Sequence, residues 1–212
     1  MNIHPAAGPS TTGGRQRALI VVLVGIDGAG KSTAARLLAH RLVSSGQPAI
    51  VTKNPCGRSR LNAWCRPLGL QVPARLMDAV ETGIRCLNVV VSQLRAGFFP
   101  GIVIMDRYLY CQQALKRVEG LGPGRAVPWL LRLLPAPDVV FYFGVPADTA
   151  RSRVAQRAAD SESLEDLEAF DQGYKELEVF PSFVIIDATS PPERIVEDIW
   201  QQLALGGRVH QR

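Results

Sequence analysis

Residues 18–33 read ALIVVLVGIDGAGKST, and the expected architecture follows from this segment. Its first part, residues 19–24, is apolar and β-branched without alternation, which is typical of a parallel strand covered on both faces. Residues 25–32 then fit the phosphate-loop pattern GxxxxGK[ST], and a helix is expected from Lys31. Strand, loop and helix in this order predict a nucleotide-phosphate site. The alternative is a glycine turn that binds nothing.

The chemistry of this loop suits phosphate. Its glycines allow backbone N–H groups to turn inward around an anion, and the following helix adds its positive dipole end. Lys31 is expected to reach the outer phosphates, where it would act catalytically, and Ser32 can ligate Mg²⁺. The residues expected to hold the ATP phosphates are Gly25, Gly28, Ala29, Gly30, Lys31, Ser32 and Thr33.

Composition and charge exclude several other classes of protein. With 212 residues and 47% apolar content, the chain is long enough for one α/β domain with a proper core. Of the formal charge of +5, four units come from terminal arginines, which leaves the body of the chain about +1 (5 − 4). These arginines are Arg15, Arg17, Arg208 and Arg212. The sequence therefore shows no basic surface for a nucleic-acid partner.

The termini and cysteines favour a soluble cytoplasmic protein. Residues 1–17 are rich in Gly, Pro, Ser and Thr, without the apolar core of a signal peptide, and are expected to form a disordered tail. We expect one domain over 18–205 and a flexible tail over 206–212. No run reaches the roughly 18 apolar residues that a membrane span needs. The cysteines lack metal-site spacing and are expected to be reduced thiols; they are Cys56, Cys65, Cys86 and Cys111.

The rest of the chain alternates strands with helices. Further strands are expected over residues 49–52, 102–105, 139–143 and 183–186. Helices are expected over 34–42, 74–96, 111–118, 127–134, 149–157, 164–179 and 191–205. This βα alternation predicts a three-layer α/β fold with a parallel sheet of about five strands. The polar connection 53–69 is longer than a plain connection needs, which indicates a substrate-side loop.

Asp106, Arg107 and Tyr108 follow the strand expected over 102–105. Ligands of an open parallel sheet bind at the carboxyl ends of its strands. A carboxylate at this edge can hold Mg²⁺ through water, and the adjacent guanidinium can bridge phosphates. We therefore expect Asp106 to contribute to the metal site and Arg107 to catalysis. The alternative is an ion pair that caps the next helix.

Together these motifs resemble thymidylate kinase and its relatives among P-loop nucleoside and nucleotide kinases. The resemblance covers residues 18–205: the phosphate loop, the Asp-Arg-Tyr, an arginine-bearing segment after the fourth strand, and Asp187-Ala188-Thr189 after the fifth. It implies a P-loop fold with an arginine-bearing lid. It also implies an ATP- and Mg²⁺-dependent kinase that transfers the γ-phosphoryl group to a nucleoside monophosphate or a similar small phosphorylated acceptor.

The same resemblance suggests where the acceptor binds. It places Arg85 on the acceptor's phosphate, where, with Arg107, it would suit an anionic acceptor; a solvated helix arginine is the alternative. Asp27 would face the acceptor's sugar or phosphate, or only order the turn. Glu81 and Tyr108 are assigned to the acceptor side as well, and Asp187 and Ala188 to the adenine side.

The phosphate loop supplies no arginine of its own, because Gly28 and Ala29 stand between Asp27 and Gly30. Phosphoryl transfer gains from cationic groups on the transferring oxygens. Lid arginines supply that charge in the family branch whose phosphate loop lacks one, and three residues here resemble them: Arg151, Arg153 and Arg157. We expect Arg153 and Arg157, spaced i and i+4, to be catalytic. A charged, solvent-facing helix is the alternative.

Several positions depart from the family pattern. Asn54 stands where thymidylate kinases have the Glu of Glu-Pro-Gly, and Glu81 stands where an aromatic ring would stack on thymine. Cys111 replaces a serine, and Leu115-Lys116 replaces Tyr-Gln. The phosphate machinery is kept while the base-reading surface is changed. The departures argue against thymidylate as the acceptor.

Two alternative functions remain open, and so does the oligomeric state. A kinase for a hydroxyl acceptor, such as a nucleoside, needs a carboxylate base. Asn54 cannot serve as that base, but Asp27, Asp78 or Glu81 could. A nucleotide-dependent switch ranks last, because the sequence lacks Asn-Lys-x-Asp and has no Asp-x-x-Gly after the third strand. A homodimer through the long helix 74–96 is the candidate assembly.

Overall fold

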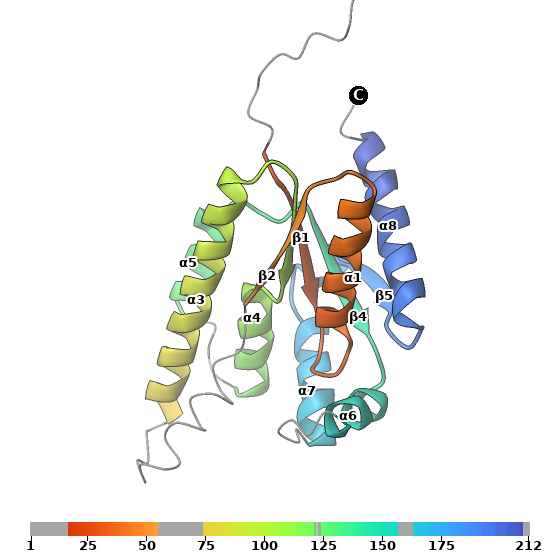
Figure 1. The fold of residues 1–212 in the computed structure, drawn as a ribbon. Coiled ribbons are helices and arrows are strands. Elements are labelled where there is room, and N and C mark those ends of the chain that lie inside the picture. The colour runs from red at the N-terminus through yellow and green to blue at the C-terminus, as the bar shows by residue number, and fades with distance from the viewer. Residues whose placement is uncertain (1–16, 55–73, 121, 123, 157–162, 210–212) are drawn as a thin grey trace, which may run out of the picture.

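Five parallel strands form one sheet in the order β2-β3-β1-β4-β5 in the computed structural model (Figure 1). The structure describes residues 17–54, 74–120, 122, 124–156 and 163–209, with only the backbone for 74–78 and 205–209. The strands are β1 (Leu19–Val24), β2 (Ala49–Lys53), β3 (Ile102–Asp106), β4 (Val139–Gly144) and β5 (Val184–Asp187). All of them therefore present their carboxyl ends at one edge of the sheet.

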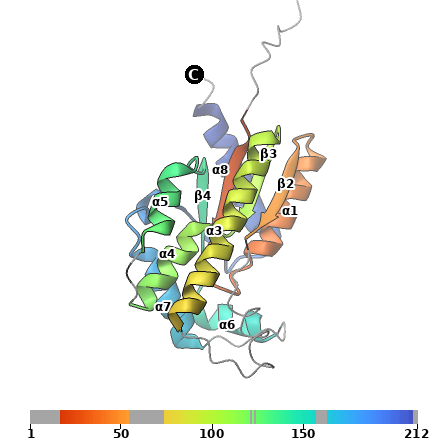
Figure 2. The ribbon, with the colours of Figure 1, turned by 90° about the vertical axis from the view of Figure 1, so that its left-hand side faces the viewer.

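Helices cover both faces of the sheet, which confirms the three-layer α/β fold. They are α1 (Lys31–Ser44), α3 (Ala74–Phe98), α4 (Leu109–Val118), α5 (Ala126–Leu133), α6 (Ala147–Ala155), α7 (Leu164–Lys175) and α8 (Pro192–Val209), with a 3₁₀ turn η2 (Phe180–Ser182). Helices α1 and α8 lie on one face, and α3, α4 and α5 lie on the other (Figures 1 and 2). In the described chain, no helix is long and apolar enough to cross a membrane.

The central strand β1 is buried on both sides, as its unbroken apolar sequence predicts. Ile20, Val22 and Val24 join the core beneath α3 and α4. Val21 and Leu23 join the core beneath α1 and α8. Because successive side chains of a strand point to opposite faces, this one strand ties both layers together and fixes the position of the loop that follows it.

Several element ends differ from expectation. Helix α3 continues through Gly97 to Phe98 and stops just before Pro100, since a residue preceding proline disfavours helix. Helix α6 ends at Ala155, not at 157, and α7 ends at Lys175, not at 179. Helix α8 runs to Val209, past the expected end at 205. The predicted N-terminal tail and most of the predicted substrate-side loop 53–69 lie outside the described residues.

Candidate active site

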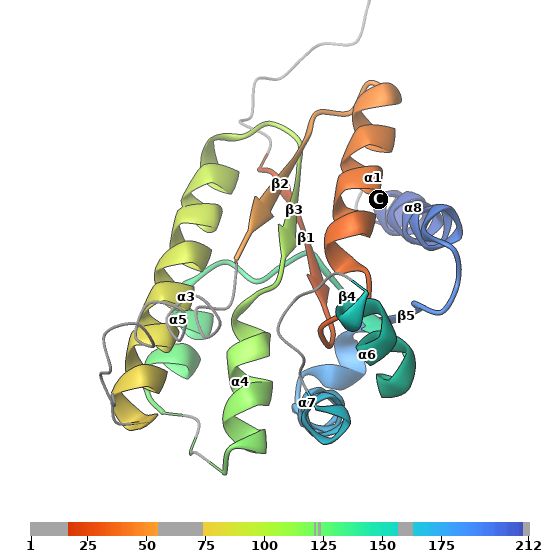
Figure 3. The same cartoon turned by 60° about the horizontal axis from the view of Figure 1, so that its bottom comes forward.

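The phosphate loop lies at the carboxyl edge of the sheet, between β1 and α1 (Figure 3). Two of its glycines are required by close contacts as well as by positive φ angles. A Cβ on Gly25 (φ 137°) would lie 2.9 Å from the carbonyl oxygen of Phe143, and one on Gly28 (φ 83°) would lie 2.2 Å from that of Ala150. The loop therefore packs directly against α6, the helix that follows β4.

Lys31 is held inside this loop. Its side chain is 4% exposed, and its Nζ donates a 2.6 Å hydrogen bond to the carbonyl of Ile26, with Oδ1 of Asp27 4.0 Å away. Burial lowers the pKa of Lys31, as does the neighbouring Arg107 charge, while Asp27 and Asp106 act in the opposite direction. An ammonium group at this place can contact the outer phosphates of a nucleotide bound in the loop.

The predicted metal ligands are in direct contact. Ser32 Oγ donates a 2.5 Å hydrogen bond to Oδ2 of Asp106. The other oxygen, Oδ1, is buried and has no hydrogen-bond partner in the part of the chain that the structure describes. Among the described residues no group of three His, Cys, Asp or Glu could hold a metal ion. Mg²⁺ in nucleotide sites typically takes one or two protein ligands and completes its shell with phosphate and water. The donor set of Ser32 and Asp106 fits that ion.

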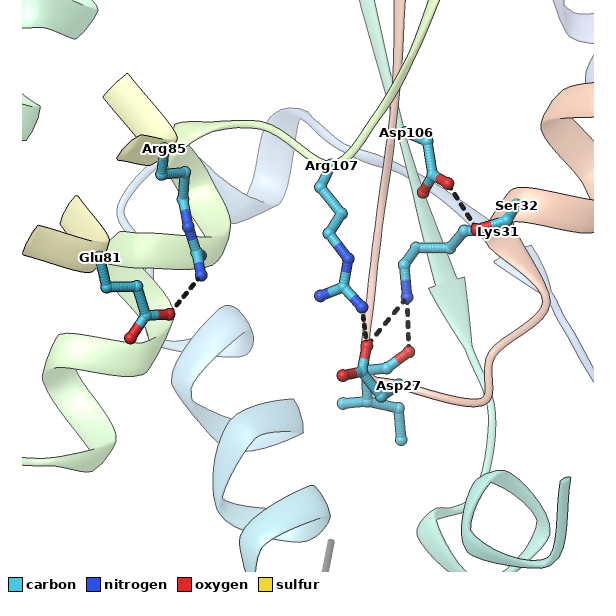
Figure 4. A network of polar contacts seen from close by, with 8 residues as sticks. Asp27, Lys31, Ser32, Glu81, Arg85, Asp106 and Arg107 are labelled. Carbon is cyan, nitrogen blue, oxygen red and sulfur yellow. Dashed lines mark hydrogen bonds and ion pairs between the residues drawn. The ribbon is translucent and has the colours of Figure 1, made fainter. Parts of the chain in front are cut away.

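Arg107 reaches the phosphate loop. Its Nη2 donates to Oδ1 of Asp27, so that one carboxylate lies between the cationic groups of Arg107 and Lys31 (Figure 4). Helix α4 has no side-chain cap at its start, and Asp106 contacts Ser32. The alternative of an Asp106–Arg107 pair that caps the next helix is therefore wrong.

Arg85 and Glu81 form an ion pair on the inner face of α3. Both side chains are 1% exposed, and Nη2 of Arg85 lies 2.9 Å from Oε1 of Glu81. The other two guanidinium nitrogens, Nε and Nη1, are buried without a hydrogen-bond partner among the described residues. The alternative of a solvated helix arginine is thus wrong. In Figure 4 the side chains of Arg85, Arg107 and Lys31 extend toward the same side of the site.

Tyr108 is placed differently from its prediction. Its side chain is 1% exposed and belongs to the core, its hydroxyl accepts a 3.1 Å hydrogen bond from Gln93, and its ring lies 5.2 Å from that of Tyr110. Cys111 on the same helix is fully buried too. The structure therefore places Tyr108 in the hydrophobic core and not in an acceptor pocket. Cys86 and Cys111 are free thiols, whereas Cys56 and Cys65 lie outside the described residues.

The predicted lid and the predicted adenine-side loop touch. Arg153 Nη1 donates a 2.9 Å hydrogen bond to the carbonyl of Ala188, whose side chain is buried. Asp187 accepts hydrogen bonds from the backbone and hydroxyl of Thr189, which lower the pKa of Asp187. Arg151 is exposed. The expected helical pairing of Arg153 with Arg157 is not present on α6, which ends at Ala155, and Arg157 lies outside the described residues.

The sequence did not indicate which residues Asn54 contacts. It is 1% exposed, and its side chain bonds both Ser92 and the carbonyl of Arg107. The only signal was its departure from the family pattern. Ser92 lies 38 positions away, so the contact between the two side chains depends on how α3 packs against the sheet.

Comparisons with known proteins agree with this geometry. A family model described as "Thymidylate kinase" matches residues 83–199. A "Probable thymidylate kinase" of Thermococcus kodakarensis is 30% identical over 201 residues, covering 85% of this chain and 95% of that protein. Proteins of the same name from Thermococcus gammatolerans (30% identical; 85% and 93% covered) and Sulfurisphaera tokodaii (29%; 82% and 89%) are similar as well. The matches span nearly the whole of these relatives.

Proposed function

This chain belongs to the thymidylate kinase family, and we propose that it is an ATP- and Mg²⁺-dependent kinase acting on a nucleoside monophosphate or a similar small phosphorylated acceptor. The donor phosphates would lie in the loop of Gly25 to Thr33, with Lys31 on the outer phosphates. Mg²⁺ would be held by Ser32 and Asp106, and it neutralises phosphate charge when bound. The need for ATP favours the cytoplasm as the place of action.

The observation that carries this proposal is the buried guanidinium of Arg85. An arginine removed from water with two nitrogens unpaired is costly unless an anion completes its hydrogen bonds. Glu81 satisfies Nη2 only. A phosphate of the acceptor would pair with the remaining nitrogens, and its oxygen would face the phosphoryl group held at the phosphate loop. An already ionised acceptor oxygen needs no strong general base, so positioning and charge neutralisation would carry the rate.

The contacts of the candidate bases disfavour a hydroxyl acceptor. Asp27 accepts a hydrogen bond from Arg107 and Glu81 accepts one from Arg85, so each carboxylate is already engaged by a guanidinium. The amide of Asn54 cannot accept a proton in this role. Asp78, the remaining candidate, lies among the side chains that the structure does not describe.

Helix α3 offers a surface for a second copy of the chain. Six exposed apolar side chains lie along it at alternating spacings of four and three: Val80, Ile84, Leu87, Val91, Leu94 and Phe98. Their exposures run from 37% to 76%. This spacing is that of a helix–helix seam, and a continuous exposed apolar stripe marks an interaction site. We propose that two copies pair through α3, which would place each dimer contact on the helix that also carries Arg85.

The proposed function is tested by following ADP release from ATP with nucleoside monophosphates, with nucleosides, and with buffer alone. Acceleration by one or more monophosphates, and not by their nucleosides, is the expected result. Acceleration by nucleosides would favour the hydroxyl-acceptor kinase. Equal release in buffer alone would indicate a nucleotide hydrolase or switch.

A further inference from the structure

We propose that Asn54 is a positioning residue of this active site, which holds the backbone of Arg107 so that its guanidinium reaches the phosphate loop. The expected effect on kcat rests on the proposed function. The support that Asn54 gives to the Arg107 backbone rests only on the hydrogen bonds in the structure. In this role Asn54 itself contacts no phosphate group. It acts through Arg107.

Asn54 makes hydrogen bonds with three different elements. Its backbone N–H donates to the carbonyl of Asp106 (3.0 Å), which continues the pairing of β2 with β3 by one residue. Its Nδ2 donates to the carbonyl of Arg107 (2.8 Å), and its Oδ1 accepts from Ser92 Oγ on α3 (3.0 Å). With 1% of its surface exposed, the side chain is confined to this arrangement.

Arg107 needs such support because of its backbone conformation. Its φ is 77°, and no other non-glycine residue in the described part of the chain has a positive φ. Residues with a Cβ populate this region sparsely, and they stay there when the surroundings fix them. The N–H of Arg107 is held by the carbonyl of Leu23 on β1 (3.0 Å), and its carbonyl is held by Asn54. The two bonds fix the residue from both sides.

The amide is suited to this position chemically. Ser92 donates to one end of the Asn54 side chain, so the other end must donate to the Arg107 carbonyl. A carboxylate can accept from Ser92 but would set a second acceptor against the Arg107 carbonyl. The structure therefore explains why a side chain with both a hydrogen-bond donor and a hydrogen-bond acceptor stands at the end of β2. A general base at this position would have no function, because the substrate proposed to receive the phosphoryl group is already ionised.

The test uses Asn54→Asp, which keeps the size and the bond to Ser92 but removes the donor to Arg107. We expect kcat to fall about 10- to 100-fold, while the KM values of ATP and acceptor stay within about threefold, since Arg107 contributes chiefly in the transition state. Ser92→Ala removes one bond and leaves the Asn54–Arg107 bond, so its kcat should fall less. In a crystal structure of Asn54→Asp, Arg107 should leave its positive φ or lose its contact with Asp27.

Tyr142→Phe serves as the matched control. It removes the hydroxyl that donates to Asp171, a part-buried bond between β4 and α7 that involves neither Asn54 nor Arg107, and so reports what lost stability alone does to the kinetics. The inference is overturned if Asn54→Asp behaves as this control does, with a lower Tm, unchanged kcat and an unmoved Arg107. If the unmodified protein phosphorylates no acceptor, the proposed function fails, and the position of Arg107 in the crystal structure still decides the role of Asn54.

Discussion

Arg85 donates a 2.9 Å hydrogen bond to Glu81, one helical turn earlier on α3, and both side chains are 1% exposed. Breaking a buried ion pair by removing one partner typically costs about 3 to 5 kcal/mol, because the other charge stays buried. Here the pair is incomplete, since no described residue makes a hydrogen bond to Nε or Nη1 of Arg85. Under the proposed function Glu81 would lie beside an anion site, where the family pattern has a stacking ring.

Opposite effects are predicted for the two members of this pair. Arg85→Ala removes charge-assisted hydrogen bonds to the acceptor's phosphate and should raise the acceptor KM about 10- to 100-fold, with the ATP KM changed less than threefold. Glu81→Gln removes a negative charge beside that phosphate and should lower the acceptor KM. Steady-state kinetics with each substrate varied in turn measure both effects.

The control for Glu81→Gln is Glu165→Gln, which removes an exposed carboxylate from α7. A higher acceptor KM in Glu81→Gln would show that Glu81 binds the acceptor directly through donors of its base or sugar. That result would contradict the role of Glu81 as the partner of Arg85.

Lys31→Ala is expected to abolish phosphoryl transfer and to leave the fold intact. The ammonium contacts a loop carbonyl and lies beside the phosphate position, so its loss removes charge stabilisation worth on the order of 3 kcal/mol or more, about 100-fold in rate. Circular dichroism and single-turnover kinetics give the two readouts. Turnover close to that of the unmodified protein would refute the phosphate-loop assignment.

Arg153→Ala should lower kcat far more than it weakens ATP binding. In this structure Arg153 bonds the Ala188 carbonyl. If the predicted lid closes over the nucleotide, Arg153 would exchange this partner for the transferring phosphoryl group and would contribute mainly in the transition state. The exposed neighbour Arg151 supplies the control, Arg151→Ala. If Arg153→Ala has equally small effects on kcat and on the ATP KM, the residue belongs to a solvated helix.

The proposed dimer is tested on the apolar stripe of α3. Leu87→Glu and Leu94→Glu place charges among side chains that are 64% and 59% exposed in the single chain. Light scattering should show a dimer for the unmodified protein and a monomer for the double variant. Val43→Glu, at an equally exposed apolar residue of α1, should leave the mass unchanged. If the unmodified protein is a monomer in solution, the proposed dimer is wrong.

The fold was predictable because its main signals are local. The run Leu19–Val24 and the glycine pattern after it specify a strand, a turn and a helix without reference to the rest of the chain. The pairing of Arg85 with Glu81 was not predicted, although the two residues are one turn apart, because their burial depends on the packing of α3 against the sheet. The role of Asn54 was hidden for the same reason, since Ser92 and Arg107 meet it only in the folded chain.

The acceptor is where this chain is expected to differ from thymidylate kinases. Base–aromatic stacking is worth about 1 to 3 kcal/mol in nucleic-acid sites. With Glu81 paired to Arg85 in place of a ring, thymidine monophosphate should lose up to about a hundredfold in affinity. Another phosphorylated acceptor should therefore be preferred over thymidine monophosphate.

Whether the acceptor already carries a phosphate is decided by comparing kcat/KM for each nucleoside monophosphate with kcat/KM for its own nucleoside. We predict at least about a 100-fold preference for one or more monophosphates, in line with the loss of charge-assisted hydrogen bonds to Arg85, and a low rank for thymidine monophosphate. Equal or better turnover of a nucleoside would contradict the claim. Efficient, selective turnover of thymidine monophosphate would agree with the proposed kinase activity, but it would contradict the prediction that another acceptor is preferred.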